Sequence, residues 1–315
     1  MDNTNGISGH RPQSGASRLR TLLADDTQIL VCPGVYDGLT ARLAIAQGFK
    51  CIYMTGAGTA ASRLGMPDLG LATMSDMLGN ASMIAALDRT VPVIADADTG
   101  YGGPNMVART VKAYITAGVA GVHLEDQVLA KRCGHLMGKE LVERDEYSAR
   151  IKAAVMARDE ERAVTGGDVV IIARTDALQK FGFEEAMERL RKSVELGADV
   201  AFLEGVTSIE QMKQACEMLK GTPVLLNMVP GGVTPQVSTE EARKIGYRLM
   251  IYPGMAMSAV IQSVGDAYKE LYETGDKKVD EADVKGGVKR LFDLVGLQRC
   301  IDFDAKAGGS AYGSV

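Results

Sequence analysis

The stretch VPVIADADTGYGGPNMVARTVKAYITAGVAGVHLEDQ, residues 91–127, decides the fold class of this 315-residue chain. It reads as an apolar strand over 92–96, a helix with helical apolar spacing over 105–117, and a second apolar strand over 121–125. Gly118 follows the helix, where glycine commonly ends one. Strands that are apolar on both faces and are joined by a helix belong to a parallel sheet covered by helices.

The same strand and helix unit repeats along the chain. The predicted strands are 28–32, 51–55, 92–96, 121–125, 169–174, 200–204, 223–227 and 248–253. The predicted helices are 38–47, 75–87, 105–117, 144–163, 183–195, 208–219, 239–245 and 257–273. Eight units favour a closed (β/α)8 barrel of the TIM type over an open doubly wound sheet. No Gly-x-Gly-x-x-Gly follows the first strand, which removes the main reason to expect a dinucleotide-binding fold.

The two ends of the chain differ from this repeat. Residues 1–20 have no apolar run, so we expect a disordered tail, and we assign residues 21–280 to the barrel. Residues 281–315 read as an extra amphipathic helix and a tail. Its apolar stripe of Val288, Leu291, Phe292 and Val295 needs a surface to pack on. The helix is therefore predicted either to be exchanged between subunits of an oligomer or to fold back onto its own barrel.

The composition of the chain argues against some classes of binding partner. The chain has 35 Lys and Arg against 40 Asp and Glu, and no basic cluster, which argues against binding nucleic acid or an anionic membrane. Its apolar runs are shorter than the ~20 residues that cross a bilayer. Five scattered cysteines without zinc spacing indicate a reducing compartment. We expect a cytoplasmic protein, with a mitochondrial location left open.

Charged and polar residues follow most of the predicted strands. In a barrel of this type, the active site lies at the carboxyl ends of the strands. The residues found there are Thr55, Gly56, Asp96, Asp98, Glu125, Asp126, Arg174, Thr175, Asp176, Glu204, Asn227 and Pro253. Any one of these carboxylates could be an ordinary solvated loop residue. Their number predicts one shared pocket.

Three of these carboxylates suit a metal ion. Asp96, Asp98 and Glu125 offer the oxygen ligands that Mg²⁺ prefers, and Mn²⁺ is the second choice. Only two histidines lie inside the predicted fold, which argues against zinc. Asp98 could instead cap the turn that follows it. His123, inside an apolar strand, is predicted to be a core residue rather than a ligand.

The segment EDQVLAKRCGHLMGK, residues 125–139, is polar and places a cysteine in a charged setting. Lys131, Arg132 and His135 should lower the pKa of the Cys133 thiol from ~8.5. Cys133 is therefore predicted to be a proton donor or a nucleophile, whereas the other cysteines read as small core residues.

Two further groups are suited to carboxylates. Arg174 can hold a substrate carboxylate through paired hydrogen bonds, or form a salt bridge with Glu125 or Glu204, and both roles can hold together. The backbone N–H groups of Gly56, Ala57 and Gly58 offer a second carboxylate site.

Taken together, these motifs resemble the isocitrate lyase and phosphoenolpyruvate mutase superfamily over about residues 20–300. The matching stretches are PGVYDGLTARLA (33–44), YMTGAGTAAS (53–62), DADTGYGG (96–103), HLEDQ with KRCGH (123–135), ARTDAL (173–178), FLEG (202–205), and LLNM with TP (225–235). The KRCGH block in its EDQ context is the most specific of them. Because phosphonate-processing mutases lack KRCGH at this point, the resemblance favours the carbon–carbon cleaving branch.

The resemblance implies a Mg²⁺-dependent (β/α)8 barrel, usually a tetramer whose subunit pairs exchange the terminal helix. Asp96, Asp98 and Glu125 match the metal site, acting partly through waters. Cys133 matches the catalytic cysteine. Arg174 and Glu125 would stabilise the charge that develops during cleavage, and Tyr53 or Asp68 would be the base. The implied substrate-binding residues are Thr55, Gly56, Ala57, Gly134, His135, Arg174, Glu204, Asn227 and Pro253.

The implied activity is cleavage of a substituted 2-hydroxy diacid, of the 2,3-dimethylmalate or 2-methylisocitrate type, to pyruvate and a carboxylate. The alternative is oxaloacetate acetylhydrolase activity, which gives oxalate and acetate. Pro253 stands where that hydrolase group carries a serine, which counts against the alternative. Phosphonopyruvate or phosphoenolpyruvate mutase chemistry and a non-catalytic oligomeric ligand sensor are more distant possibilities.

Overall fold

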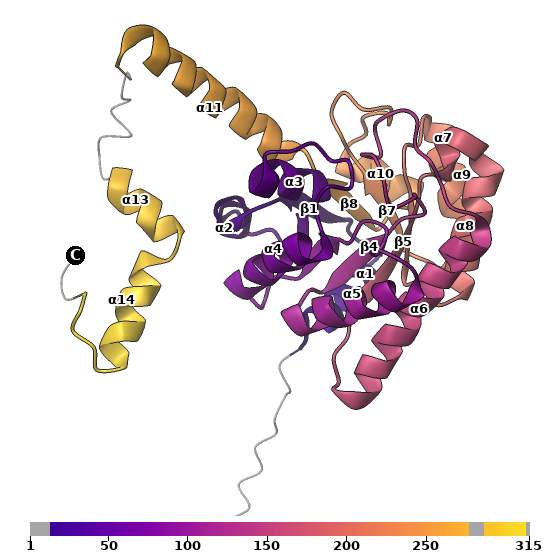
Figure 1. The fold of residues 1–315 in the computed structure, drawn as a ribbon, viewed down its shortest axis with the longest axis horizontal. Coiled ribbons are helices and arrows are strands. Elements are labelled where there is room, and N and C mark those ends of the chain that lie inside the picture. Colours follow the sequence, from indigo (N-terminus) through magenta and orange to yellow (C-terminus); the bar gives the residue numbers. More distant parts are fainter. Residues whose placement is uncertain (1–12, 277–286, 313–315) are drawn as a thin grey trace, which may run out of the picture.

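The computed structural model describes residues 13–276 and 287–312 of the chain. Within these residues, eight parallel strands close a barrel in sequence order, and β1 pairs with β8 through Leu30 and Leu249 (Figure 1). The strands are β1 (Leu30–Val35), β2 (Ile52–Met54), β3 (Val93–Asp96), β4 (Gly121–Leu124), β5 (Val170–Thr175), β6 (Val200–Leu203), β7 (Val224–Asn227) and β8 (Leu249–Tyr252). The predicted (β/α)8 fold is confirmed.

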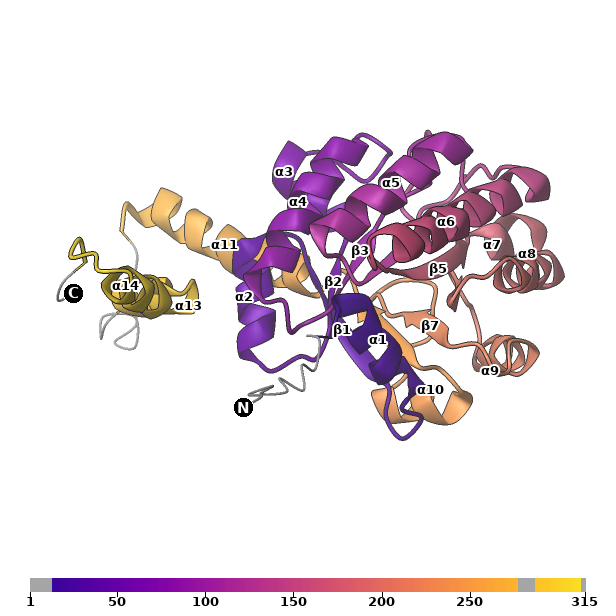
Figure 2. The same cartoon turned by 90° about the horizontal axis from the view of Figure 1, so that it is seen from below.

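Most helices of the described residues surround this barrel, and the last three extend away from it, as Figure 2 shows from below. The helices are α1 (Gly15–Ala24), α2 (Gly38–Ala46), α3 (Gly56–Leu64), α4 (Met74–Leu87), α5 (Pro104–Ala117), α6 (Arg144–Val164), α7 (Ala177–Phe181), α8 (Phe183–Glu195), α9 (Ile209–Met218), α10 (Thr239–Ile245), α11 (Met255–Thr274), α13 (Gly287–Leu294) and α14 (Leu297–Lys306). Three of them, α1, α3 and α7, were not predicted, because each is short or lies where a loop was expected.

Helix α5 illustrates how the sequence sets an element and positions the site. Proline occupies its first position, where no N–H is needed, and Gly118 ends it in the left-handed region at φ 82°. Val107, Val111 and Tyr114 are buried on its inner face. The Tyr114 hydroxyl donates to the Asp96 carbonyl at 3.1 Å, which ties the helix to the end of β3.

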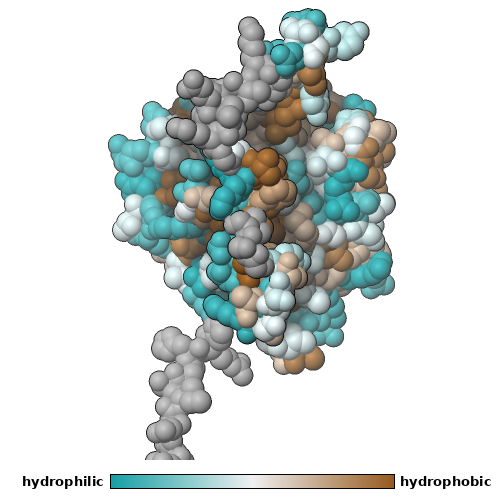
Figure 3. Space-filling model, turned by 90° about the vertical axis from the view of Figure 1, so that its left-hand side faces the viewer, coloured by the Kyte–Doolittle hydropathy of each residue, from teal (hydrophilic) through white to brown (hydrophobic). Residues whose placement is uncertain are grey.

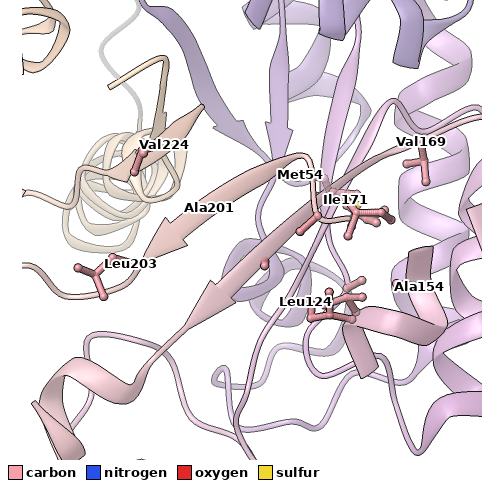
Figure 4. Packing of buried hydrophobic residues seen from close by; sticks show 14 of the residues in the cluster. Met54, Leu124, Ala154, Val169, Ile171, Ala201, Leu203 and Val224 are labelled. Carbon is pink, nitrogen blue, oxygen red and sulfur yellow. The ribbon is translucent and has the colours of Figure 1, made fainter. Parts of the chain in front are cut away.

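Two hydrophobic layers stabilise the barrel. One fills the space between the strands and the helices, and Figure 4 shows some of its side chains, among them Leu124, Ala154 and Ile171. The other fills the barrel interior toward the amino ends of the strands and includes Leu30, Ile94 and other apolar residues from most strands. Such interdigitated side chains make the barrel a packed core rather than a pore.

Helix α1 closes the amino end of the barrel and corrects a prediction. The disordered tail expected over 1–20 is wrong for residues 15–20, which belong to this helix, whereas residues 1–12 lie outside the described residues. Ser14 caps the helix, and Leu19 is fully buried in the interior layer. Arg20 forms an ion pair of 2.5 Å with Asp199. The short apolar stripe could not be recognised without the barrel end that buries it.

The C-terminal helices extend away from the barrel (Figure 1). The single extra helix predicted after residue 284 is two helices, α13 and α14, because Gly296 adopts a positive φ of 97° between them. None of the described residues of α11, α13 and α14 is buried. Figure 3, which faces this end of the molecule, shows hydrophobic patches among hydrophilic ones. Residues 277–286 and 313–315 lie outside the described residues.

Among the described residues, no helix is both long and apolar enough to cross a membrane. All five cysteines lie within the described part of the chain and are free thiols.

Candidate active site

A cavity of about 140 Å³ opens at the carboxyl ends of the barrel strands. It brings together side chains from distant parts of the sequence, from Tyr53 to Met257. The predicted site residues on its wall are Tyr53, Thr55, Ala57, Asp68, Asp96, Cys133, Gly134, His135, Arg174, Glu204, Asn227 and Pro253. Gly56 and Glu125 lie behind this wall, in contact with the wall residues Asp96 and Arg174. Asp98 instead lines a neighbouring cavity together with its partner Lys131. The shared pocket expected from the strand ends is present.

Asp96 ends β3 and organises the turn that follows it. Its Oδ1 accepts the Asp98 N–H at 2.8 Å, and its Oδ2 accepts the Gly56 N–H at 3.2 Å. Asp98 and Tyr101 have positive φ values of 46° and 65°, a conformation that costs free energy and often occurs at functional sites. Burial raises the pKa of Asp96, and it raises the pKa of Asp98 to about 6. The turn is therefore held in a strained form that buries both carboxyl groups, with Asp96 on the cavity wall and Asp98 beside Lys131 in the neighbouring cavity.

Lys131 supplies a positive charge to this turn. Its Nζ lies 2.6 Å from Asp98 Oδ1 and 2.7 Å from Asp68 Oδ1. Burial alone would lower the pKa of the Lys131 ammonium, but Asp98 and Glu125 outweigh that effect and raise it. Lys131 thus stays charged and connects the segment that carries Cys133 to two acidic residues.

Arg174 ends β5 among three acidic residues. Its guanidinium lies 2.9 Å from Asp176, 3.1 Å from Glu125 and 3.6 Å from Glu204. Burial alone would raise the pKa of Asp176, but Arg174 and Lys139 hold it below its ordinary value. Arg174 forms the structural ion pairs that the sequence suggested and also faces the cavity.

The acidic groups at this mouth outnumber the basic ones. Ion pairs join five carboxylates to the three cations Lys131, Lys139 and Arg174, and Asp96 adds a sixth carboxylate. Burial raises the pKa of Glu125 well above its ordinary value, and neither of its buried carboxyl oxygens has a hydrogen bond. An excess of buried acid is an environment that a bound cation would stabilise.

The three predicted metal ligands fit a hydrated cation better than a fully enclosed one. Within residues 13–276 and 287–312, no three acidic, histidine or cysteine side chains form a complete ligand cluster. Asp98 turns toward Lys131, and Asp96 is engaged by backbone N–H groups. Mg²⁺ commonly keeps several waters and uses one or two carboxylates. The oxygen donors of Asp96 and Glu125 match that chemistry.

The pKa of Cys133 corrects a prediction. Burial raises the pKa of the thiol, although neighbouring cations were expected to lower it. Lys131 is committed to its two carboxylates and therefore does not act as a free charge beside the thiol. A protonated thiol on the cavity wall can donate a proton, so this pKa agrees with the predicted role of Cys133 as a proton donor. It disfavours the alternative role as a nucleophile, which needs the thiolate.

The segment that carries Cys133 is held down at both ends. Gln127 and Leu141 form an antiparallel bridge at its base. Lys139 is buried and donates to the Gly134 carbonyl at 2.7 Å and to Asp176 Oδ1 at 2.8 Å. A side chain at Gly134 would approach Glu204 Cγ to 2.8 Å, so this position needs glycine. The loop therefore packs directly on the arginine and glutamate of the cavity.

The far side of the cavity carries a polar trio. Asn227 Nδ2 donates to Glu204 Oε2 at 3.0 Å and lies 3.3 Å from His135 Nε2. His135 Nε2 is also 3.6 Å from Glu204 Oε1. These contacts bring together three of the predicted substrate-binding residues from β6, β7 and the Cys133 segment.

The predicted backbone anion site after β2 is smaller than expected. The Gly56 N–H donates to Asp96, and the Gly58 N–H donates to Thr55 Oγ1 at 3.3 Å. Thr55 is the N-cap of α3, so the turn uses its own side chain to satisfy the helix start. Among the described residues, only the Ala57 N–H of this turn is left for a ligand.

Tyr53 and His123 lie beneath the cavity. The Tyr53 hydroxyl is 2.8 Å from His123 Nε2, and burial raises the pKa of Tyr53 well above its ordinary value. His123 is fully buried, as the core prediction required, and burial lowers its pKa to about 3. A phenol this difficult to ionise is poorly suited to the base role considered for Tyr53.

Two residues that support the site were given no individual role from the sequence, although Asp176 is among the strand-end residues expected in the shared pocket. Lys139 and Asp176 join the Cys133 segment to Arg174, yet neither was assigned a role. Asp176 follows Arg174 by two residues at a strand end, which is a usable signal. Lys139 offers none, because its partners come from other parts of the chain.

Comparison with known proteins places these features in a family. Residues 19–272 match the family model described as phosphoenolpyruvate phosphomutase. The 2,3-dimethylmalate lyase of Eubacterium barkeri is 40% identical over 90% of this chain and 95% of its own.

Solved structures agree with the sequence match. A 2,3-dimethylmalate lyase structure is 48% identical, with a TM-score of 0.91 over 96% of this chain and 98% of that chain. An oxaloacetate acetylhydrolase in complex with the inhibitor 3,3-difluorooxalacetate is 50% identical, with a TM-score of 0.90 over 95% of this chain and 99% of that chain. The two structures are nearly equal in likeness, so the choice between their activities depends on individual residues.

Proposed function

The chain is a lyase of the isocitrate lyase/phosphoenolpyruvate mutase superfamily, and on that premise we propose that it cleaves a substituted 2-hydroxy diacid of the 2,3-dimethylmalate type. The products would be pyruvate and a carboxylate. The observation that carries the proposal is one cavity wall that holds Cys133, Arg174 and Pro253 together. These residues supply an acid, a carboxylate-binding guanidinium and an apolar surface in place of a hydroxyl.

We propose Mg²⁺ as the cofactor, with Mn²⁺ as a substitute, held by Asp96 and Glu125 with Asp98 acting through water. When bound, the cation would lower the pKa of the substrate hydroxyl and neutralise an adjacent carboxylate. The excess of buried carboxylates supports this assignment, as does Glu125, whose two carboxyl oxygens have no hydrogen bond and only the ion pair with Arg174. The cation would also offset the burial that raises the pKa of Asp98 to about 6.

The chain's own residues account for the proton transfers. Asp68 is the better candidate for the base that removes the hydroxyl proton, because it lines the cavity and Tyr53 is held as a neutral phenol. Breaking the C2–C3 bond leaves an electron pair on C3. The Cys133 thiol, kept protonated by burial, donates its proton to that carbon.

Substrate recognition follows from the remaining wall residues. Arg174 would bind one carboxylate by paired hydrogen bonds. The second carboxylate would use Thr55 and the Ala57 N–H, with Gly134, His135, Glu204 and Asn227 closing the opposite side. Gly56 contributes by holding Asp96 rather than by binding substrate directly.

A product assay tests this function. Purified protein with Mg²⁺ is expected to release pyruvate from 2,3-dimethylmalate or 2-methylisocitrate, and chelation of the metal should stop the release. A panel that also contains oxaloacetate and phosphonopyruvate identifies the substrate class. Inertness toward the first two compounds, together with oxalate formation from oxaloacetate, would reverse the proposal.

Oxaloacetate hydrolysis is the second candidate, favoured by the 50% identity to the acetylhydrolase structure. Pro253 argues against it, since a proline at this wall position cannot supply the hydroxyl that would hold a hydrated ketone. Pro253→Ser is therefore expected to increase oxalate formation from oxaloacetate. A variant with unchanged or lower oxalate formation would remove this residue as the discriminator.

We also propose that the protein is a homotetramer whose subunits exchange C-terminal helices. On α11, Ile261 is 76% exposed and Tyr272 is 92% exposed, and Val260, Val264, Tyr268 and Leu271 of the same helix are exposed too. Apolar side chains exposed as a group commonly mark a protein interface. Light scattering of the purified protein and of a chain truncated after residue 254 tests this, and a monomeric full-length protein would contradict it. The cytoplasmic location stays a prediction.

A further inference from the structure

A buried aromatic pair lies directly beneath the cavity and has no role in the proposed proton transfers. Tyr53 on β2 and His123 on β4 are 3% and 0% exposed, and their rings stack with centroids 5.7 Å apart. Phe202 meets the imidazole edge-on at 5.8 Å. Tyr53 forms part of the cavity wall, whereas His123 lies behind it. The two rings are therefore fixed in place. Only the positions of the Tyr53 hydroxyl hydrogen and the His123 ring proton can differ.

The two atoms that meet can share one hydrogen bond in two ways. Tyr53 Oη and His123 Nε2 are 2.8 Å apart. If His123 carries its proton on Nδ1, the Tyr53 hydroxyl must donate to Nε2. If His123 carries its proton on Nε2, the imidazole donates and the hydroxyl hydrogen is free to point elsewhere.

The surroundings of the other ring nitrogen favour the second arrangement. Nδ1 of His123 is buried and has no hydrogen-bond partner. A proton there would be a buried donor without an acceptor, and orphaned buried N–H groups are rarer in proteins than unpaired acceptors.

Asp96 gives an independent reason for the same choice. Its Oδ1 lies 3.5 Å from His123 Nε2 and already accepts the N–H of Asp98. A carboxylate oxygen accepts hydrogen bonds but cannot donate them, so at this distance it presents negative charge to Nε2. An N–H at Nε2 is attracted to it, whereas a lone pair at Nε2 would be repelled.

We infer that neutral His123 carries its proton on Nε2, donates it to Tyr53 Oη, and so directs the Tyr53 hydroxyl hydrogen into the cavity. Tyr53 is then a hydrogen-bond donor to an anionic oxygen of the bound diacid, and His123 is its positioning residue. No second acceptor for the Tyr53 hydroxyl exists among the described residues. The diacid part of this inference rests on the proposed function, whereas the position of the proton does not.

Nitrogen NMR of the full-length protein tests the proton position directly. The side-chain ¹⁵N signals of His123, assigned by their loss in His123→Gln, are expected to show a protonated Nε2 and an unprotonated Nδ1 at neutral pH. A protonated Nδ1, or a doubly protonated ring, would overturn the inference. This measurement needs no substrate, so it stands even if the proposed reaction is wrong.

A binding measurement tests the consequence for the ligand. With Mg²⁺ present, calorimetry with oxalate as the probe is expected to show affinity weakened by about tenfold to a hundredfold in Tyr53→Phe, as for loss of a hydrogen bond to a charged group. His123→Leu should lose a similar factor, and His123→Gln, which keeps an N–H donor, should recover most of it.

Tyr247→Phe is the matched control, because Tyr247 is an equally buried tyrosine whose hydroxyl has no partner and which lies outside the cavity wall. Its oxalate affinity should equal that of the unmodified protein. Unchanged affinity in Tyr53→Phe would overturn the donor role, and equal affinity of His123→Leu and the unmodified protein would overturn the positioning role.

Discussion

The two ends of the barrel interior are lined by the same eight strands, but one end is apolar and the other is polar and charged. Toward the amino ends, the interior is filled by apolar side chains and is closed by Leu19 of α1. At the carboxyl ends, the interior holds Asp96, Glu125, Arg174 and other polar groups, several of them with unsatisfied atoms. Burying charges without full compensation costs free energy. The difference indicates that the apolar end stabilises the fold and thereby permits a strained, acidic mouth.

The largest expected effect is at the mouth. Cys133→Ser should reduce turnover by about 10²- to 10⁴-fold, the usual contribution of a positioned acid, because a serine hydroxyl is a far weaker acid than a thiol. Manganese binding and the unfolding midpoint should stay unchanged. Cys216→Ser is the control, since Cys216 lies near the amino end of the barrel beside Pro223 and Arg248. Near-normal turnover in Cys133→Ser would remove the thiol from the mechanism.

A substitution at the apolar end should produce the reverse pattern. Leu19→Ala should lower the free energy of unfolding by about 2–5 kcal/mol, the usual result of truncating a fully buried leucine. Turnover per folded molecule should stay the same, because Leu19 lies at the end of the barrel away from the cavity. Urea denaturation and active-site-normalised kinetics check both parts. A loss of turnover under folding conditions would mean that the two ends are not separable.

Lys139 connects the mouth to its loop, so its loss should affect both properties moderately. Lys139→Met leaves the Gly134 carbonyl and one side of Asp176 unpaired, which should cost about 1–3 kcal/mol of unfolding free energy. The loop should also open more often, so Cys133 should react faster with iodoacetamide. Lys152→Met, an exposed lysine on α6, is the control. An unchanged alkylation rate in Lys139→Met would show that the loop does not depend on this contact.

The effect that is smallest near neutral pH is a pH dependence that originates beneath the cavity. The pKa of His123 is about 3 in the folded protein and about 6.5 in the unfolded chain, so the unfolded chain binds this proton first as the pH falls. His123 therefore makes the protein progressively less stable from about pH 6.5 downward. The difference in unfolding free energy between the unmodified protein and His123→Gln should fall by up to about 1.4 kcal/mol per pH unit. A difference that is independent of pH would contradict the buried neutral imidazole.

The same contrast explains which features could be predicted from sequence. The eight strands were located to within a few residues because apolar runs and glycine stops are local signals. The site residues that follow strands were also predictable, since strand order places them at one mouth. Helix α1 was missed because its apolar stripe has meaning only against the barrel end that buries it.

Electrostatic properties were harder to predict than positions. The pKa of Cys133 was expected to be lowered by adjacent cations, yet Lys131 is committed to Asp68 and Asp98, so burial determines the direction. The role of Lys139 has no signal within its own segment, because its acidic partner lies 37 residues along the chain. Such pairings depend on the folded arrangement.

The most direct test of the central claim is cleavage of 2,3-dimethylmalate in deuterated water with Mg²⁺. We expect the carboxylate product to carry one deuterium on the carbon that was C3 of the substrate, because the thiol proton of Cys133 exchanges with solvent before it is donated. Cys133→Ala should form this product at least a hundredfold more slowly. Product without deuterium, or an undiminished rate in Cys133→Ala, would contradict the claim that a protonated thiol at the barrel mouth completes the reaction.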